Sequence, residues 1–148
     1  MTSPRLNSLK RMSLLLRRAS GMSDKQILLV DDEPSLLEIF GMMLKRQGFT
    51  VWKATNALDA LDLVRNIKPD LFILDVMMPG MNGIELCREL RTWPDTHTTP
   101  VMMLSALGDS HTQRASIDAG ADLYLQKPVL PRELVNRVQE LVGELMPH

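Results

Sequence analysis

The chain has 148 residues, of which 45% are apolar, and a formal net charge of −1. This length suits one domain with a sizeable core, and the apolar content excludes a disordered chain. The single cysteine, Cys87, excludes an intrachain disulfide and a CxxC metal site, and we expect it to be a buried core thiol. No apolar stretch approaches the roughly 20 residues that a membrane-spanning helix needs.

The charges are distributed unevenly along the chain. Residues 1–22 contain five basic residues and no acid, whereas the remaining 12 basic and 18 acidic residues give residues 23–148 a charge of −6. We expect residues 1–22 to be a basic N-terminal extension, either disordered or upstream of a native start at Met22, and residues 23–148 to be the domain. An amphipathic helix that binds an anionic surface through Leu9, Met12 and Leu16 is the alternative. A secretory signal is not expected, and the acidic domain offers no basic groove for nucleic acid.

Strand and helix patterns alternate strictly through the domain. Short apolar runs predict strands near residues 26–30, 50–53, 71–74, 100–104 and 121–125. Helical periodicity predicts helices near residues 34–47, 57–67, 83–92, 109–119 and 131–145. Continuous apolar strands are typical of a sheet that is covered on both faces. We therefore predict an α/β fold with a doubly wound five-stranded parallel sheet, five helices and right-handed crossovers.

The first and fourth predicted helices differ in the strength of their signals. The first has Pro34 in its first turn and Gly48 at its C-terminal end, both typical helix boundaries. The fourth has only Ala115, Ile117 and Ala119 as apolar support before Gly120, its expected cap. Such weak support predicts a marginal helix.

Polar side chains follow four of the five predicted strands. Asp31 and Asp32 follow the first strand, Asp75 the third, Ser105 the fourth and Lys127 the fifth. The carboxyl ends of parallel strands meet at one edge of an open α/β sheet, where such folds bind their ligands. We therefore expect these side chains to converge.

Three clustered carboxylates repel one another, and a divalent cation relieves that repulsion. Mg²⁺ takes one or two carboxylates together with a phosphate oxygen, and Mn²⁺ would be a substitute. Asp75 could then attack phosphorus and form an acyl phosphate, as carboxylate nucleophiles do. Lys127 would neutralise charge on the phosphoryl group and Ser105 would donate a hydrogen bond to it.

Four motifs together resemble a receiver domain of two-component response regulators. They are Val30-Asp31-Asp32-Glu33-Pro34, the segment from Asp75 to Gly83 (DVMMPGMNG), Ser105-Ala106 and Lys127-Pro128. The match covers roughly residues 25–146. The resemblance implies a flavodoxin-like, three-layer fold with strand order 2-1-3-4-5, as in the chemotaxis receiver.

The resemblance also implies roles for individual residues. Asp75 would accept a phosphoryl group from a phosphohistidine. Asp32, Asp75 and the backbone carbonyl of Met77 would ligate Mg²⁺, and Asp31 would act largely through water. Lys127 would pair with the phosphoryl group and precede a cis peptide bond to Pro128.

A conformational switch is implied as well. Ser105 would move toward the phosphoryl group and Tyr124 would turn inward, which would change the face made by the fourth helix, fifth strand and fifth helix. The implied partners are a sensor histidine kinase or a histidine phosphotransfer protein and a downstream protein, with dimerisation on phosphorylation left open. The protein would be a bacterial cytoplasmic, stand-alone receiver without an enzymatic output domain, and it would phosphorylate and dephosphorylate itself with Mg²⁺.

Simpler interpretations exist for each residue taken alone. These are helix caps (Asp31, Asp32), a turn-forming acid (Asp75), the N-cap of the fourth helix (Ser105), a solvated surface charge (Lys127) and a half-buried strand aromatic (Tyr124). His97, His111 and His148 have no metal-ligand spacing, so we expect all three at the surface.

Two other functions compete with the receiver. An Mg²⁺-dependent phosphatase with an aspartyl phosphate would generally need an acid two residues after Asp75, where this chain has Met77. A phosphate-independent interaction module with a receiver-like fold is the other alternative.

Overall fold

The computed structural model describes residue 12 and residues 25–143. The expectations for residues 1–22, Met12 apart, and for His148 lie outside the described residues. None of the helices that are described is long and apolar enough to cross a membrane.

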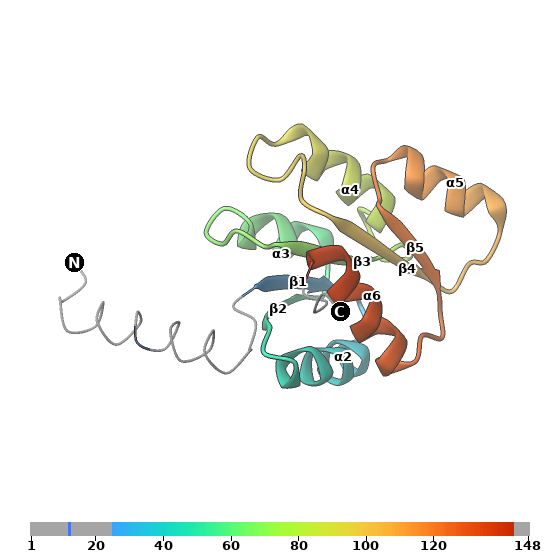
Figure 1. The fold of residues 1–148 in the computed structure, drawn as a ribbon. Helices are drawn as coiled ribbons and strands as arrows, with labels where there is room; N and C mark the ends of the chain where they lie inside the picture. Colours follow the sequence, from blue (N-terminus) through green and yellow to red (C-terminus); the bar gives the residue numbers. More distant parts are fainter. Residues whose placement is uncertain (1–11, 13–24, 144–148) are drawn as a thin grey trace.

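The described residues form a five-stranded parallel sheet with the order β2-β1-β3-β4-β5, as predicted (Figure 1). The strands are β1 (Gln26–Val30), β2 (Thr50–Ala54), β3 (Leu71–Asp75), β4 (Val101–Ser105) and β5 (Leu123–Gln126). The helices that connect and follow them are α2 (Pro34–Arg46), α3 (Ala57–Leu63), α4 (Gly83–Thr92), α5 (Ser110–Asp118) and α6 (Pro131–Val142).

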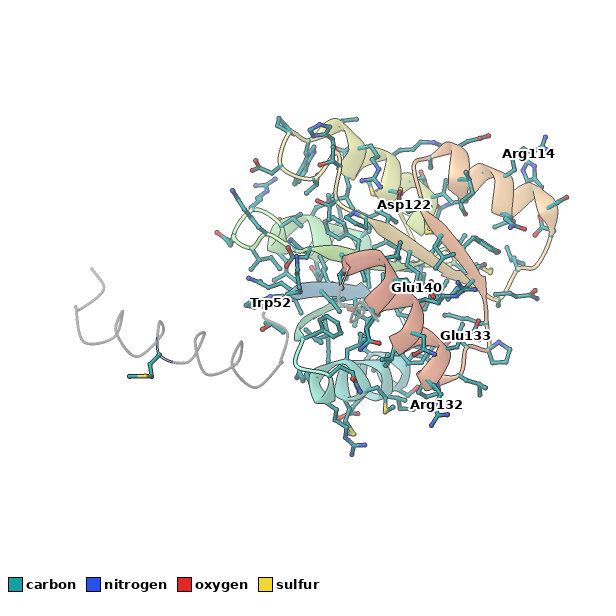
Figure 2. The ribbon with its side chains drawn as sticks, viewed as in Figure 1. Trp52, Arg114, Asp122, Arg132, Glu133 and Glu140 are labelled. Atoms are coloured by element: carbon teal, nitrogen blue, oxygen red, sulfur yellow. The ribbon has the colours of Figure 1, made fainter. Side chains whose placement is uncertain are left out.

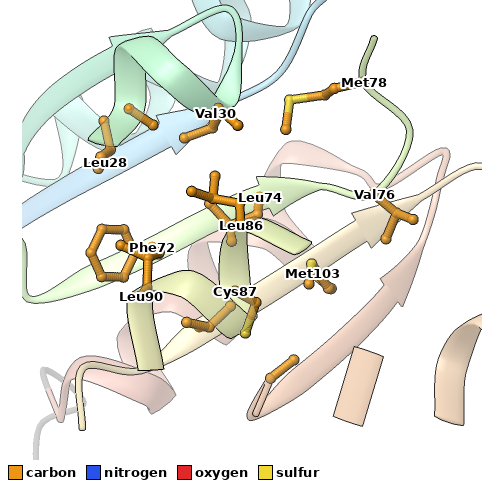
Figure 3. Close-up of a cluster of buried hydrophobic side chains, with 14 of the residues drawn as sticks. Leu28, Val30, Phe72, Leu74, Val76, Met78, Leu86, Cys87, Leu90 and Met103 are labelled. Atoms are coloured by element: carbon orange, nitrogen blue, oxygen red, sulfur yellow. The ribbon is translucent and has the colours of Figure 1, made fainter. Parts of the chain in front are cut away.

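The sheet separates two apolar cores, which makes the fold three-layered. Helices α2 and α6 cover one face, and α3, α4 and α5 cover the other (Figure 1). On the second face, Leu86, Cys87 and Leu90 of α4 pack against strand side chains such as Phe72 and Leu74 (Figure 3). Every residue of β3 and β4 is buried, which explains their continuous apolar sequences.

The outer face of α6 carries charged side chains where the domain meets solvent. Arg132, Glu133 and Glu140 lie along the exposed side of α6 (Figure 2). His97 and His111 are exposed, as predicted.

Local signals explain where α4 begins. The side chain of Asn82 accepts a hydrogen bond from the Glu85 N–H at 2.9 Å, and the Glu85 carboxylate accepts one from the Asn82 N–H at 3.1 Å. This reciprocal capping box satisfies two N–H groups at the start of the helix. The start of α4 is therefore anchored directly after the loop that follows Asp75.

The structure corrects the face predicted for α5. Ile117 is 47% exposed, whereas Thr112 and Ser116 are buried toward the sheet. The Ser116 hydroxyl donates to the Thr112 carbonyl at 2.9 Å, and the Thr112 hydroxyl donates to the carboxylate of Asp109, the N-cap, at 2.8 Å, so the hydroxyls on this inner face have local partners. Hydroxyl side chains with local partners can occupy a buried helix face, and a pattern that counts only apolar residues misses them.

Some element boundaries also differ from the prediction. Helix α3 ends at Leu63 rather than near residue 67, and β5 begins at Leu123 rather than at residue 121. The Asp122 N–H donates to the Val101 carbonyl at 2.8 Å, but the Val101 N–H donates to the Asp122 carboxylate at 2.8 Å rather than to a backbone carbonyl.

Candidate functional site

Three carboxylates meet at the carboxyl edge of the sheet. Asp31 and Asp32 follow β1, Asp75 ends β3, and the two strands are hydrogen-bonded neighbours. One oxygen atom from each of the three side chains lies within 4.8 Å of the others. Asp31 and Asp75 are only 2% and 4% exposed. The convergence that the strand endings predicted is therefore present.

Lys127 completes this cluster from the end of β5. Its Nζ donates to Asp31 Oδ2 at 2.8 Å and lies 3.4 Å from Asp75 Oδ1. The side chain of Lys127 is 14% exposed, so the interpretation as a solvated surface charge is wrong. The peptide bond between Lys127 and Pro128 is cis, as the resemblance implied.

Burial and neighbouring charges shift the pKa values of Asp75 and Lys127. Burial and then the negative charge of Asp31 raise the pKa of Asp75 from 3.8 to about 6, and Lys127 only partly offsets them. Burial by itself would lower the pKa of Lys127, but its hydrogen bond to Asp31 and the two negative charges raise that pKa above its usual value. The cluster thus holds more negative charge than its single cation neutralises.

This set of donors fits a hard divalent cation. Carboxylate oxygens are the ligands that Mg²⁺ and Mn²⁺ prefer, and a metal relieves the repulsion from Asp31 that, after burial, raises the pKa of Asp75. The backbone N–H of Met77 donates to Asp75 Oδ1 at 3.3 Å, so the chain folds back over this carboxylate. The role of the Met77 carbonyl as a metal ligand stays a prediction.

The simpler interpretation of the acids as helix caps does not fit the structure. The N-cap of α2 is Glu33, which makes no side-chain cap bond. Asp31 accepts a hydrogen bond from the Glu33 N–H at 2.9 Å, but the same carboxylate also binds Lys127. Asp31 therefore organises the site as well as the entry to α2.

Ser105 is fully buried at the end of β4. Its Oγ accepts a hydrogen bond from the Leu107 N–H at 3.0 Å. The N-cap of α5 is Asp109, whose carboxylate accepts from the Thr112 N–H, so the alternative interpretation of Ser105 as the cap of this helix is wrong. The hydroxyl of Ser105 supports the turn after β4 instead.

Tyr124 lies on β5 with its ring partly buried against the core between the sheet and α4. Its hydroxyl donates to the backbone carbonyl of Leu107. This contact ties β5 to the loop after β4, although the switching role of Tyr124 stays a prediction.

One residue that positions the site was missed by the sequence reasoning. A Cβ added to Gly83 would lie 2.8 Å from the carbonyl carbon of Asp75 and closer still to its oxygen. Helix α4 therefore begins in direct contact with the backbone of the central carboxylate. The only signal for this was a glycine at the start of a helix, where it is a poor helix former.

A surface cleft opens beside the carboxylates. Asp32, Met77 and Leu107 line it, together with Val76, Met78, Pro79, Asn82, Ile84 and Thr112. Met77 and Leu107 are 53% and 40% exposed, so apolar side chains flank the accessible side of the acidic cluster.

Comparisons with known proteins agree with this geometry. The family model of the response regulator receiver domain matches residues 27–139. The DNA-binding response regulator MtrA of Mycolicibacterium smegmatis is 43% identical over 115 residues, which make up 78% of this chain and 49% of that protein. The chain spans about half the length of the curated relatives it matches.

Solved structures show the same fold. The chemotaxis response regulator CheY4 of Vibrio cholerae has a TM-score of 0.77 at 28% identity, over 80% of this chain and 99% of that one. The receiver domain of the sensor histidine kinase PA1611 of Pseudomonas aeruginosa, which has a magnesium ion in its active site cleft, has a TM-score of 0.75 at 26% identity, over 82% and 99%. Since the family model covers more than half of the chain, this protein belongs to the response regulator receiver domain family.

Proposed function

We propose that this domain is the phosphoacceptor of a two-component phosphorelay and that Asp75 takes the phosphoryl group. The observation that carries the proposal is the meeting of Asp31, Asp32 and Asp75 with Lys127 at one edge of the sheet. A structural ion pair would need one carboxylate for one lysine, whereas this site gathers two nearly buried acids and a third beside them. That excess of negative charge fits a site that binds a cation and then a phosphoryl group.

The proposed reaction is a phosphoryl transfer to a carboxylate. A carboxylate oxygen of Asp75 attacks the phosphorus atom of a phosphohistidine, the O–P bond forms, and the P–N bond breaks with its electron pair returning to the imidazole. Such a transfer depends mainly on in-line positioning and on neutralising charge. β3 and Gly83 hold the backbone of Asp75 in place, which supports the positioning.

The other residues of the site neutralise and orient charge in this proposal. Asp31, Asp32, Asp75 and the Met77 carbonyl would hold Mg²⁺, or Mn²⁺ in its place. When bound, the cation supplies positive charge to the phosphoryl oxygens and relieves the repulsion among the carboxylates. Lys127 would move from its present contacts with Asp31 and Asp75 to pair with a phosphoryl oxygen. Ser105 would donate its hydroxyl proton to another.

The proposed partners follow from this chemistry. The donor would be a sensor histidine kinase or a histidine phosphotransfer protein in the bacterial cytoplasm. Phosphorylation would switch the face made by α5, β5 and α6, through Ser105 and Tyr124, for binding a downstream protein or a second copy. Residues 23–148 would form the receiver and residues 1–22 a separate extension. The domain would act as a phosphoacceptor rather than on a separate substrate.

The experiment is intact-protein mass spectrometry after incubation with Mg²⁺ and acetyl phosphate. Wild type should gain one adduct of about 80 Da, as expected for an acyl phosphate on a carboxylate nucleophile. Asp75→Asn should gain none, and omission of the metal should abolish the adduct. Asp95→Asn, which changes an exposed acid outside the site, should behave like wild type.

Two other outcomes would contradict the proposal. An adduct that persists in Asp75→Asn would place the nucleophile elsewhere. No adduct on wild type, combined with no binding of the phosphoryl mimic fluoroberyllate, would favour the phosphate-independent interaction module.

A further inference from the structure

The loop between β4 and α5 comprises Ala106, Leu107, Gly108 and Asp109, and all four residues are exposed. It borders the acidic site, because Leu107 and Asp32 line the same cleft. The backbone of Leu107 is held on both sides, since its N–H donates to Ser105 Oγ and its carbonyl accepts from the Tyr124 hydroxyl. The conformation of this loop therefore depends on side chains outside it.

Gln126 makes the next contact along the loop. Tyr124 and Gln126 are two residues apart on β5, so their side chains point to the same face of the sheet. A Cβ added to Gly108 would lie 2.5 Å from both Nε2 and Oε1 of Gln126. The end of the Gln126 side chain therefore occupies the space that any other residue at position 108 would fill.

The backbone at position 108 does not require a glycine. The described glycines with a positive φ are Gly48, Gly80, Gly120 and Gly143, so the backbone of Gly108 is one that any residue adopts. The end of the exposed Gln126 side chain takes up the neighbouring space, so a larger residue at position 108 would displace it.

The backbone of Gln126 adjoins the site as well. Gln126 is the register partner of Ser105 in the sheet, and the next N–H, that of Lys127, donates to the Ser105 carbonyl at 2.7 Å. One end of Gln126 is thus fixed beside the Ser105–Lys127 pair, while its side chain reaches three residues further along the loop.

We propose that Gln126 is a positioning residue that holds the β4–α5 loop in its phosphate-free conformation through its contact with Gly108. The inference rests on the proposed function, since it concerns how the conformation of this loop changes when Asp75 carries a phosphoryl group. A contact present in only one of two conformations lowers the apparent affinity for a ligand that selects the other. Removing the contact therefore increases the affinity for a phosphoryl mimic.

The test measures the affinity of the full chain for fluoroberyllate in saturating Mg²⁺ by calorimetric titration. Gln126→Ala is expected to bind about 2- to 5-fold more tightly than wild type, the size of effect that loss of one packing contact gives through such an equilibrium. Gly108→Ala is expected to give a similar increase, because its new Cβ displaces the Gln126 side chain. The double variant is expected to gain no more than either single one, as for two residues that share one contact.

Two matched variants separate this role from a general structural one. Gln126→Met keeps the length of the side chain and is expected to restore the wild-type affinity. Gln113→Ala removes an exposed glutamine from α5 and is expected to change nothing. Without ligand, amide hydrogen exchange of residues 106–109 is expected to be faster than in wild type for Gln126→Ala, but not for Gln126→Met or Gln113→Ala.

The outcomes distinguish the inference from the function on which it rests. If wild type binds fluoroberyllate and Gln126→Ala binds it equally or more weakly, the positioning role is overturned while the proposed function stands. If no variant binds it, the proposed function fails and the inference fails with it.

Discussion

Asp75→Asn should stabilise the metal-free domain at neutral pH. In the folded protein, burial and the charge of Asp31 raise the pKa of Asp75 from 3.8 to about 6. This rise of about 2 pKa units corresponds to about 3 kcal/mol at 1.36 kcal/mol per unit, an upper bound for the cost of ionising Asp75 in the fold. Asparagine keeps the size of the side chain and cannot ionise, so the variant avoids this cost.

The sign of the effect depends on pH. Well below pH 3.8 Asp75 is neutral in the folded and unfolded protein, so the substitution should change the free energy of unfolding little. Between pH 3.8 and about 6 the unfolded chain ionises first, and wild type progressively loses stability relative to Asp75→Asn. Above about pH 6 the gain of the variant should level off at roughly 1–3 kcal/mol.

The assay is thermal and urea unfolding in EDTA across this pH range. A gain of that size raises the melting temperature by on the order of 4 °C for each kcal/mol in a domain of this length. Asp95→Asn, a change at an exposed acid, should stay close to wild type at every pH. Added Mg²⁺ should stabilise wild type more than Asp75→Asn, because a ligand that binds only the folded protein adds to its stability. Equal stability of wild type and Asp75→Asn in EDTA at pH 7.5 would refute the reasoning.

Three other substitutions test the packing of the site and of the domain by urea unfolding. Lys127→Gln in EDTA should lose roughly 1–3 kcal/mol at pH 7.5, since it leaves two nearly buried carboxylates without their cation; an unchanged midpoint would mean that the pair contributes nothing. Gly83→Ala should lose about 1–3 kcal/mol by crowding the Asp75 backbone, and a neutral result would show that α4 can move away. Arg91→Ala should lose roughly 2–4 kcal/mol, because this side chain donates to three backbone carbonyls; the exposed Arg88→Ala is its control.

Most of the fold could be predicted because strands in a sheet that is covered on both faces have continuous apolar sequences. The continuous apolar run before Asp75 is a strand in the middle of the sheet, at the predicted residues. The prediction fails where polar side chains are buried. On the inner face of α5, Thr112 and Ser116 are buried in place of the expected Ile117. Local hydrogen bonds make such faces possible, and they depend on geometry rather than on hydropathy.

The members of the site could be predicted as well, but their pairing could not. The location of each residue at the end of a predicted strand indicated that Asp31, Asp75 and Lys127 lie at the same edge of the sheet. That Lys127 donates to Asp31 at 2.8 Å while Asp75 lies 3.4 Å away depends on side-chain positions that no pattern encodes. The same holds for Gln126 against Gly108, a contact between a strand and a loop 18 positions apart in the sequence.

The loop that follows Asp75 begins and ends close to that residue. The Val76 N–H donates to Leu104 on β4, and the Gly83 N–H donates back to the Val76 carbonyl at 3.0 Å, so residues 77–82 form an excursion whose two ends meet. Hydrogen bonds fix both ends of this loop, but Met77 within the loop is 53% exposed and lines the cleft. Substitution of Met77 therefore changes the accessible side of the acidic cluster without rebuilding the scaffold, and in the proposed function it would adjust the lifetime of the signal independently of the stability of the domain.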